Sequence, residues 1–214
     1  MVMERANLFE CFSYLASKVT DEIVVSGIGF FEWLGLTAGR EANLSIGQMG
    51  TTVPLALGIA SCMPNRRVLC LTTDGDLLME LGVLPPLGKE KPKNMIVIVN
   101  DNEHYQQTHE EGRGYWPTLT ASGTDLEAIA KACGIEHTAT VRSSQQFKSE
   151  LDDALKEERL TFIVIKTVPL PYRVFRPDID HIEAKYRFAR YMERSEGFSI
   201  LPKEQQDRSL LELK

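Results

Sequence analysis

An aspartate and an asparagine, Asp74 and Asn102, each follow a short run of apolar residues, as expected where buried strands end. The runs cover residues 68–71 and 95–99. If the two strands pair in a parallel sheet, a carboxylate and an amide oxygen meet at its C-terminal edge, where open α/β sheets bind ligands. Hard oxygen ligands suit Mg²⁺, which keeps positions open for phosphate oxygens. These residues therefore predict a site for a Mg²⁺-complexed diphosphate.

Two motifs around these residues resemble those of thiamine-diphosphate-dependent enzymes. Asp-Gly at 74–75, a gap of 25 residues and Asp-Asn at 101–102 are similar to the signature GDG followed by NN or DN. Gly-Gln-Met-Gly at 47–50, running into Pro54, is similar to the G-x-M-G…PAAIGA stretch of acetolactate synthase-type enzymes. Over roughly residues 1–170, the chain resembles the small β subunit of split sulfopyruvate and phosphonopyruvate decarboxylases.

The resemblance implies a Mg²⁺ site and a binding site for thiamine diphosphate. The implied metal ligands are the side chains of Asp74 and Asn102 and the backbone carbonyl of His104. The implied cofactor-binding residues are Gly47, Gln48, Met49, Gly50, Asp74, Gly75, Asp76, Asn102 and Tyr105. Without a cofactor, Asp74 would cap a helix beginning near Leu77, and Asn102 would shape a turn.

The loop at 47–50 resembles the one beneath the thiamine ring, where an apolar side chain, here Met49, bends the cofactor into a V. That bend brings the aminopyrimidine nitrogen to the thiazolium C2. Alternatively, Met49 is a core residue under a Gly-rich turn. Gly75 would let the backbone approach a diphosphate closely, and the following helix N-terminus would supply amide donors.

Thr73 and Asp76 depart from the family pattern. Thr73 replaces the first glycine of the signature, and Asp76 replaces a small residue. A carboxylate beside a diphosphate is electrostatically unfavourable unless it faces the metal or a Lys or Arg side chain. This departure motivates an alternative in which the chain is a non-catalytic subunit. A third alternative, an aspartyl phosphotransferase with a D-x-D motif, is disfavoured because Leu77 stands where a threonine is usual.

Two histidines are candidate catalytic residues, His104 and His109. A histidine near the reacting carbon can transfer protons at neutral pH, although histidines in loops are often simply solvated. Arg113 is a candidate partner for an anionic group on the substrate. All three lie in the long polar stretch 101–123, and a loop of this length in a compact domain is usually functional.

The chain lacks a second domain that could supply the glutamate contacting the cofactor's pyrimidine ring. The resemblance therefore implies a hetero- or homo-oligomer in which a separate pyrimidine-binding α subunit completes the site. Thiamine diphosphate would add as an ylid to a 2-oxo acid, releasing CO₂. The expected function is thus the β subunit of a thiamine-diphosphate- and Mg²⁺-dependent 2-oxo acid decarboxylase. A carboligase of the acetolactate synthase type is the catalytic alternative.

Composition supports an ordinary globular protein. The 214 residues are 43% hydrophobic and 25% charged, enough for one domain with a substantial core. The net charge of −6 disfavours nucleic-acid binding. No apolar run is long enough for a transmembrane helix, and the first residues do not resemble a signal peptide. The cysteines show no C-x-x-C spacing. We expect a cytoplasmic protein with no membrane partner.

Strand-like and helix-like segments alternate through residue 167, which predicts an α/β fold: a doubly wound parallel sheet with helices on both faces. A helix over 77–84 is expected to be broken or kinked by Pro85-Pro86. Thr124 and Glu127 predict a capping box. Residues 1–170 form the predicted diphosphate-binding domain. Residues 171–214 form an extension whose helix, over 178–194, docks on a neighbour or packs on its own domain.

Overall fold

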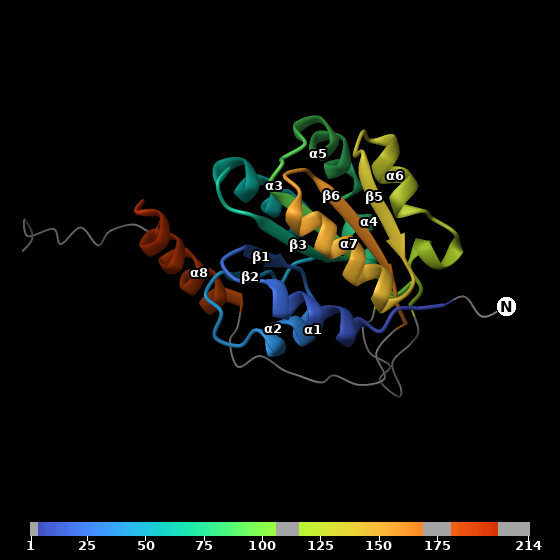
Figure 1. Ribbon diagram of the computed structural model, residues 1–214, viewed down its shortest axis with the longest axis horizontal. Helices are drawn as coiled ribbons and strands as arrows, with labels where there is room; N and C mark the ends of the chain where they lie inside the picture. The colour runs from blue at the N-terminus through green and yellow to red at the C-terminus, as the bar shows by residue number, and fades with distance from the viewer. Residues whose placement is uncertain (1–3, 106–115, 169–180, 201–214) are drawn as a thin grey trace, which may run out of the picture.

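The computed structural model of this chain describes residues 4–105, 116–168 and 181–200. Within these ranges, six parallel strands form one sheet in the order β2-β1-β3-β4-β6-β5 (Figure 1). The strands are β1 Ile23–Ser26, β2 Asn43–Ser45, β3 Val68–Thr73, β4 Met95–Asp101, β5 His137–Val141 and β6 Thr161–Lys166. The doubly wound parallel sheet predicted from the sequence is confirmed.

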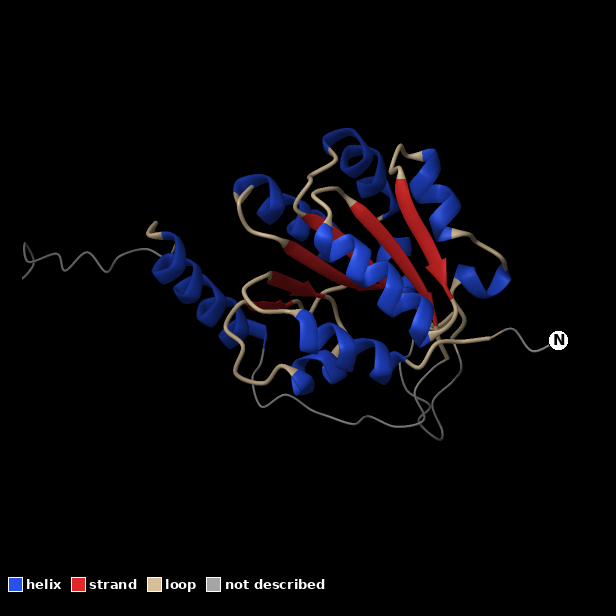
Figure 2. Ribbon diagram, viewed as in Figure 1, coloured by secondary structure: helices blue, strands red, loops and turns tan. Residues whose placement is uncertain are grey.

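Helices cover both faces of the sheet (Figure 2). They are α1 Leu8–Lys18, α2 Phe31–Leu36, α3 Thr52–Cys62, α4 Asp74–Met79, α5 Leu84–Glu90, α6 Leu126–Ala132, α7 Ser144–Lys156 and α8 His181–Glu196. Helices α1, α2 and α7 pack on one face, around Phe12, Trp33 and Phe147. Helices α3 to α6 and α8 cover the other face.

The central strands, β3 and β4, are continuous apolar runs because they are buried on both faces of the sheet. Every residue of β4 is buried, as are the first five residues of β3, because helices cover both faces of a doubly wound sheet. In the register between these strands, Thr73 lies opposite Asn100. Asp74 and Asn102 therefore emerge from neighbouring strands at the same C-terminal edge.

Three local features differ from the sequence-based expectations. Strand β2 was not predicted, since it has only three residues and two of them are polar. The prediction for Pro85-Pro86 was wrong: α4 ends at Met79, a short 3-10 helix follows at Leu81–Val83, and the prolines lie in the first turn of α5. There proline lacks only an N–H that has no helical partner.

The cap of α6 also differs from the expected capping box. Asp125, rather than Thr124, is the N-cap residue, and its side chain accepts a hydrogen bond from the amide of Ala128 at 3.0 Å. Aspartate at this position satisfies one of the amides that a helix start leaves without a partner. The helix itself was correctly placed.

Helix α8 packs on its own domain, beside β2 at one end of the molecule (Figure 1). Its own residues Ala184, Phe188 and Met192 are buried. The side chains of Ile182 and Tyr186 are exposed by 67% and 49%. Docking of this outer face on a neighbouring subunit stays a prediction.

Candidate functional site

The C-terminal edge of β3 and β4 gathers the residues that the motifs single out. Asp74 is the first residue of α4, directly after β3, and Asn102 directly follows β4. Thr73 is the N-cap of α4, and its hydroxyl accepts a hydrogen bond from the amide of Asp76 at 3.1 Å. Asp74 therefore does not cap this helix, and its carboxylate is available for other contacts.

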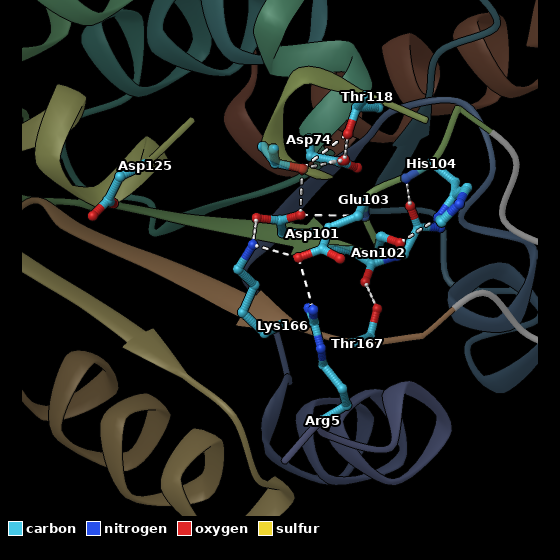
Figure 3. Close-up of polar contacts among 12 residues, drawn as sticks. Arg5, Asp74, Asp101, Asn102, Glu103, His104, Thr118, Asp125, Lys166 and Thr167 are labelled. Carbon is cyan, nitrogen blue, oxygen red and sulfur yellow. Dashed lines mark hydrogen bonds and ion pairs between the residues drawn. The ribbon is translucent and has the colours of Figure 1, made fainter. Parts of the chain in front are cut away.

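The carboxylate of Asp74 is buried and only half satisfied. Its Oδ2 accepts hydrogen bonds from the hydroxyls of Thr118 at 2.6 Å and Thr120 at 3.1 Å (Figure 3). Its Oδ1 is buried and has no hydrogen-bond partner among the residues that the structure describes. A buried anionic oxygen without a partner is costly, and a bound cation would remove that cost. This is the direct structural fit to a metal ligand.

Burial raises the pKa of Asp74 to about 6, while Thr118 and Thr120 lower it and Asp101 raises it. At pH 7 the carboxylate is therefore still mostly ionised, yet its charge is poorly solvated. Both properties favour binding of a hard cation.

Asn102 and His104 form a tight turn after β4. The Oδ1 of Asn102 accepts a hydrogen bond from the amide of His104 at 2.9 Å, and the Nδ1 of His104 lies 2.9 Å from the carbonyl oxygen of Asn102. Asn102 is buried, and its side-chain oxygen has a second lone pair. In the described part of the chain, no three His, Cys, Asp or Glu side chains converge as a metal site. The predicted metal ligands are instead a carboxylate, a side-chain amide and a backbone carbonyl, those of Asp74, Asn102 and His104.

The ring of Tyr105 covers Gly75. A Cβ atom added at Gly75 would lie 2.7 Å from the Cδ1 of Tyr105. The lack of a side chain at this position is thus explained by a protein contact, and close approach to a diphosphate stays a prediction. Tyr105 is anchored through its amide, which donates to the carbonyl of Trp116 at 2.9 Å. His104 and Pro117 form a β-bridge beside it.

The loop at residues 47–50 connects β2 to α3 at the same edge of the sheet. Gly47 and Gln48 are exposed, and Met49 is half-buried. Gly50 has a φ of 77°, a conformation that favours glycine. Its amide donates to the Oδ1 of Asp76 at 2.5 Å. The structure therefore brings this loop to the helix that carries Asp74.

The carboxylate of Asp76 is engaged entirely by protein groups. Besides the Gly50 amide, it accepts hydrogen bonds from the hydroxyls of Thr52 at 2.5 Å and Thr72 at 2.9 Å. Asp76 is fully buried. These contacts answer the electrostatic objection to a carboxylate at this position, because three donors stabilise its charge. Direct contact of Asp76 with a cofactor stays a prediction.

A network of ion pairs lies beside the site (Figure 3). The Oδ2 of Asp101 is 2.6 Å from the Nζ of Lys166, which also lies 3.2 Å from Glu103. Arg5, from the N-terminal segment, contacts Glu103 at 2.7 Å. Glu103 has a φ of 65°, unusual for a residue with a side chain. This network fixes the turn that carries Asn102.

Three residues of the site were not predicted: Thr118, Thr120 and Glu80. The hydroxyls of Thr118 and Thr120 come from a segment more than 40 positions beyond Asp74, so no local spacing indicates this contact. Glu80 directly follows α4, four positions after Asp76, and its contact with the Val53 amide also spans more than 20 positions. The candidates His109 and Arg113 lie outside the described residues.

Comparisons with known proteins match most of the domain that carries this site. The C-terminal TPP binding domain of thiamine pyrophosphate enzymes matches residues 36–165. Sulfopyruvate decarboxylase subunit beta from Methanocaldococcus jannaschii is 37% identical over 81% of this chain and 90% of its own length. Phosphonopyruvate decarboxylase from Streptomyces viridochromogenes is 30% identical over 69% of this chain and 36% of its own length.

A solved structure shares the fold. A putative thiamin diphosphate-dependent enzyme from Mycobacterium smegmatis superimposes with a TM-score of 0.62, at 22% identity, over 77% of this chain and 32% of that protein. At this identity the likeness supports the fold alone.

Proposed function

Since this chain belongs to the thiamine pyrophosphate enzymes, as their C-terminal TPP binding domain, we propose that it is the β subunit of a 2-oxo acid decarboxylase. The enzyme depends on thiamine diphosphate and Mg²⁺ and acts on a sulfopyruvate- or phosphonopyruvate-like substrate. The observation that carries this proposal is the Oδ1 of Asp74, which has no partner among the described residues and lies at the sheet edge that also carries Asn102.

Mg²⁺ is held by the side chains of Asp74 and Asn102 and by the backbone carbonyl of His104. The support is chemical, because carboxylate, amide and carbonyl oxygens are the ligands that Mg²⁺ uses while leaving positions for phosphate oxygens. Thr118 and Thr120 occupy the other oxygen of Asp74. They thereby leave Oδ1 as the oxygen for the metal.

The loop of Gly47, Gln48, Met49 and Gly50 binds the ring part of the cofactor, and Gly75 and Tyr105 border the diphosphate. When bound, thiamine diphosphate supplies the carbanion chemistry that lets CO₂ leave a 2-oxo acid. The protein positions the acid, excludes water and transfers protons. We assign proton transfer to His104 and His109.

The chain requires a pyrimidine-binding α subunit. It matches almost the whole of a relative named subunit beta but about a third of the phosphonopyruvate decarboxylase. Large apolar side chains are exposed near the candidate site, including Trp116 at 63% and Leu119 at 61%. Clusters of this kind are typical of interaction surfaces. The assembly is therefore an oligomer with the cofactor between its subunits.

We expect the assembly to work in the cytoplasm. In the described ranges no helix combines the length and apolar character needed to cross a bilayer. The side chains of Cys11, Cys62, Cys70 and Cys133 are all unpaired, which is usual in reducing compartments.

The test is CO₂ release from sulfopyruvate, phosphonopyruvate and pyruvate by the chain mixed with its α-subunit candidate, with thiamine diphosphate and Mg²⁺. Turnover of an anionic 2-oxo acid that needs both chains supports the proposal. Formation of an acetohydroxy acid from two pyruvate molecules would identify a carboligase instead. Absence of turnover together with absence of cofactor binding would identify a non-catalytic subunit.

A further inference from the structure

Asp76 contacts two separate segments beneath the candidate cofactor site, residues 50–52 and strand β3. Its Oδ1 accepts from the Gly50 amide at 2.5 Å, and its Oδ2 accepts from the hydroxyls of Thr52 at 2.5 Å and Thr72 at 2.9 Å. Thr72 belongs to β3, next to Thr73. Gly50 lies in the loop at residues 47–50, here called the ring loop because it is proposed to bind the thiamine rings, and Thr52 is the first residue of α3. The carboxylate thus ties the ring loop to the strand that leads into Asp74.

The fold makes room for this carboxylate at Gly27. A Cβ atom built on Gly27 would lie 2.6 Å from the Oδ2 of Asp76 and 2.7 Å from the hydroxyl of Thr52. Contacts this short do not occur in proteins, so only glycine permits the arrangement. The absence of a side chain at Gly27 therefore leaves the space that the carboxylate of Asp76 and the hydroxyl of Thr52 occupy.

A second carboxylate, that of Glu80 directly after α4, contacts the start of α3. The Oε1 of Glu80 accepts a hydrogen bond from the Val53 amide at 3.1 Å. Helix α3 has no side-chain cap from its own N-cap residue, Thr51. Glu80 thus satisfies an amide in the first turn of α3 that Thr51 leaves without a side-chain cap.

We propose that Asp76 is a positioning residue that sets the ring loop, residues 47–50, relative to the metal ligand Asp74. This inference rests on the proposed function. Its carboxylate, held by the Gly50 amide and the hydroxyls of Thr52 and Thr72, fixes the separation between the two halves of the cofactor site. Loss of the link to α3 should therefore weaken binding of the thiamine rings and leave binding of the Mg²⁺-diphosphate part unchanged.

Two threonines offer a matched pair of variants. Thr52 and Thr72 are both fully buried and donate to the same oxygen of Asp76, but only Thr52 carries the link to α3. Thiamine diphosphate and inorganic diphosphate, each with Mg²⁺, are titrated into the chain with its α subunit. In Thr52→Val we expect the affinity for thiamine diphosphate, divided by the affinity for inorganic diphosphate, to fall about tenfold, as for loss of a hydrogen bond to a charged group. In Thr72→Val the ratio should stay that of the wild type.

Hydrogen exchange provides a readout that does not depend on the cofactor. The Gly50 amide should exchange faster in Asp76→Ala than in the wild-type chain, because its acceptor is gone. An unchanged ratio in Thr52→Val, or an equal fall in both threonine variants, would overturn the positioning role; so would unchanged exchange at Gly50. If the wild-type pair bound inorganic diphosphate but no thiamine diphosphate, the proposed function would fail, and Gly50 exchange would still decide whether Asp76 holds the loop.

Discussion

Replacing Glu80 by glutamine tests the electrostatics of the buried carboxylates beneath the site. Glu80 is 8% exposed. Its Oε1 accepts from the Val53 amide at 3.1 Å, while its Oε2 has no partner within the described ranges. Burial raises the pKa of Glu80 to about 7; the Val53 amide lowers it and the charge of Asp76 raises it. The folded protein therefore holds a proton that the unfolded chain would release.

The sign and size of the effect follow from that difference. Between the ordinary value of 4.5 and about 7, the folded state binds more protons than the unfolded state, so stability decreases as pH rises. At ~1.36 kcal/mol per pH unit, the wild-type protein loses about 3 kcal/mol of unfolding free energy across this pH range. Glutamine has the same shape, still accepts from Val53 and does not titrate. The free energy of unfolding of Glu80→Gln, relative to wild type, should thus rise by about 3 kcal/mol from pH 4.5 to pH 8.

Urea unfolding at several pH values between 4.5 and 8 measures this difference directly. Glu136→Gln is the control, since Glu136 is an exposed glutamate whose pKa is lowered by a hydrogen bond from Lys91. The unfolding free energy of Glu136→Gln, relative to wild type, should not rise between pH 4.5 and pH 8. If the curves for Glu80→Gln and wild type ran parallel across the range, the assignment of a destabilising buried charge at Glu80 would be refuted.

Three further substitutions test local contacts. In Gly75→Ala the new Cβ would meet the ring of Tyr105 at 2.7 Å, so we expect a lower melting temperature that Tyr105→Ala restores in the double variant; no restoration would refute the contact. Gly88→Ala would place a Cβ 1.9 Å from the carbonyl oxygen of Cys133, which should cost about 3 kcal/mol or prevent folding; a wild-type urea midpoint would contradict this packing. Asp125→Ala should cost about 1 kcal/mol through loss of the α6 cap, and an unchanged unfolding free energy would show that the cap is dispensable.

The sequence predicted the positions of Asp74 and Asn102 because buried parallel strands are unambiguous. The runs at 68–71 and 95–99 are apolar throughout, and each ends in polar residues, so the ends of β3 and β4 could be placed closely. Parallel pairing then followed from the alternation of strands and helices. Strand β2 escaped prediction because its short sequence, Asn43–Ser45, carries no periodic apolar signal.

The remaining errors concern choices that depend on neighbouring elements. Proline fits the first turn of a helix as well as the point beyond its end, so Pro85-Pro86 alone could not show that α5 begins there. The charge of Asp76 posed an apparent conflict with a diphosphate. That conflict disappears only when the donors of Gly50 and Thr52 are known, and they lie more than 20 positions away. Contacts of this kind are fixed by tertiary structure.

The central claim is that the Oδ1 of Asp74, without a partner in the part of the chain that the structure describes, holds the metal that binds thiamine diphosphate. Isothermal titration of thiamine diphosphate into the chain with its α-subunit candidate tests it, with and without Mg²⁺, for wild type and Asp74→Asn. We expect binding that requires Mg²⁺ and the partner in the wild type and is at least about tenfold weaker in Asp74→Asn. Equal binding by the two proteins, or no binding by the wild-type pair, would contradict the claim.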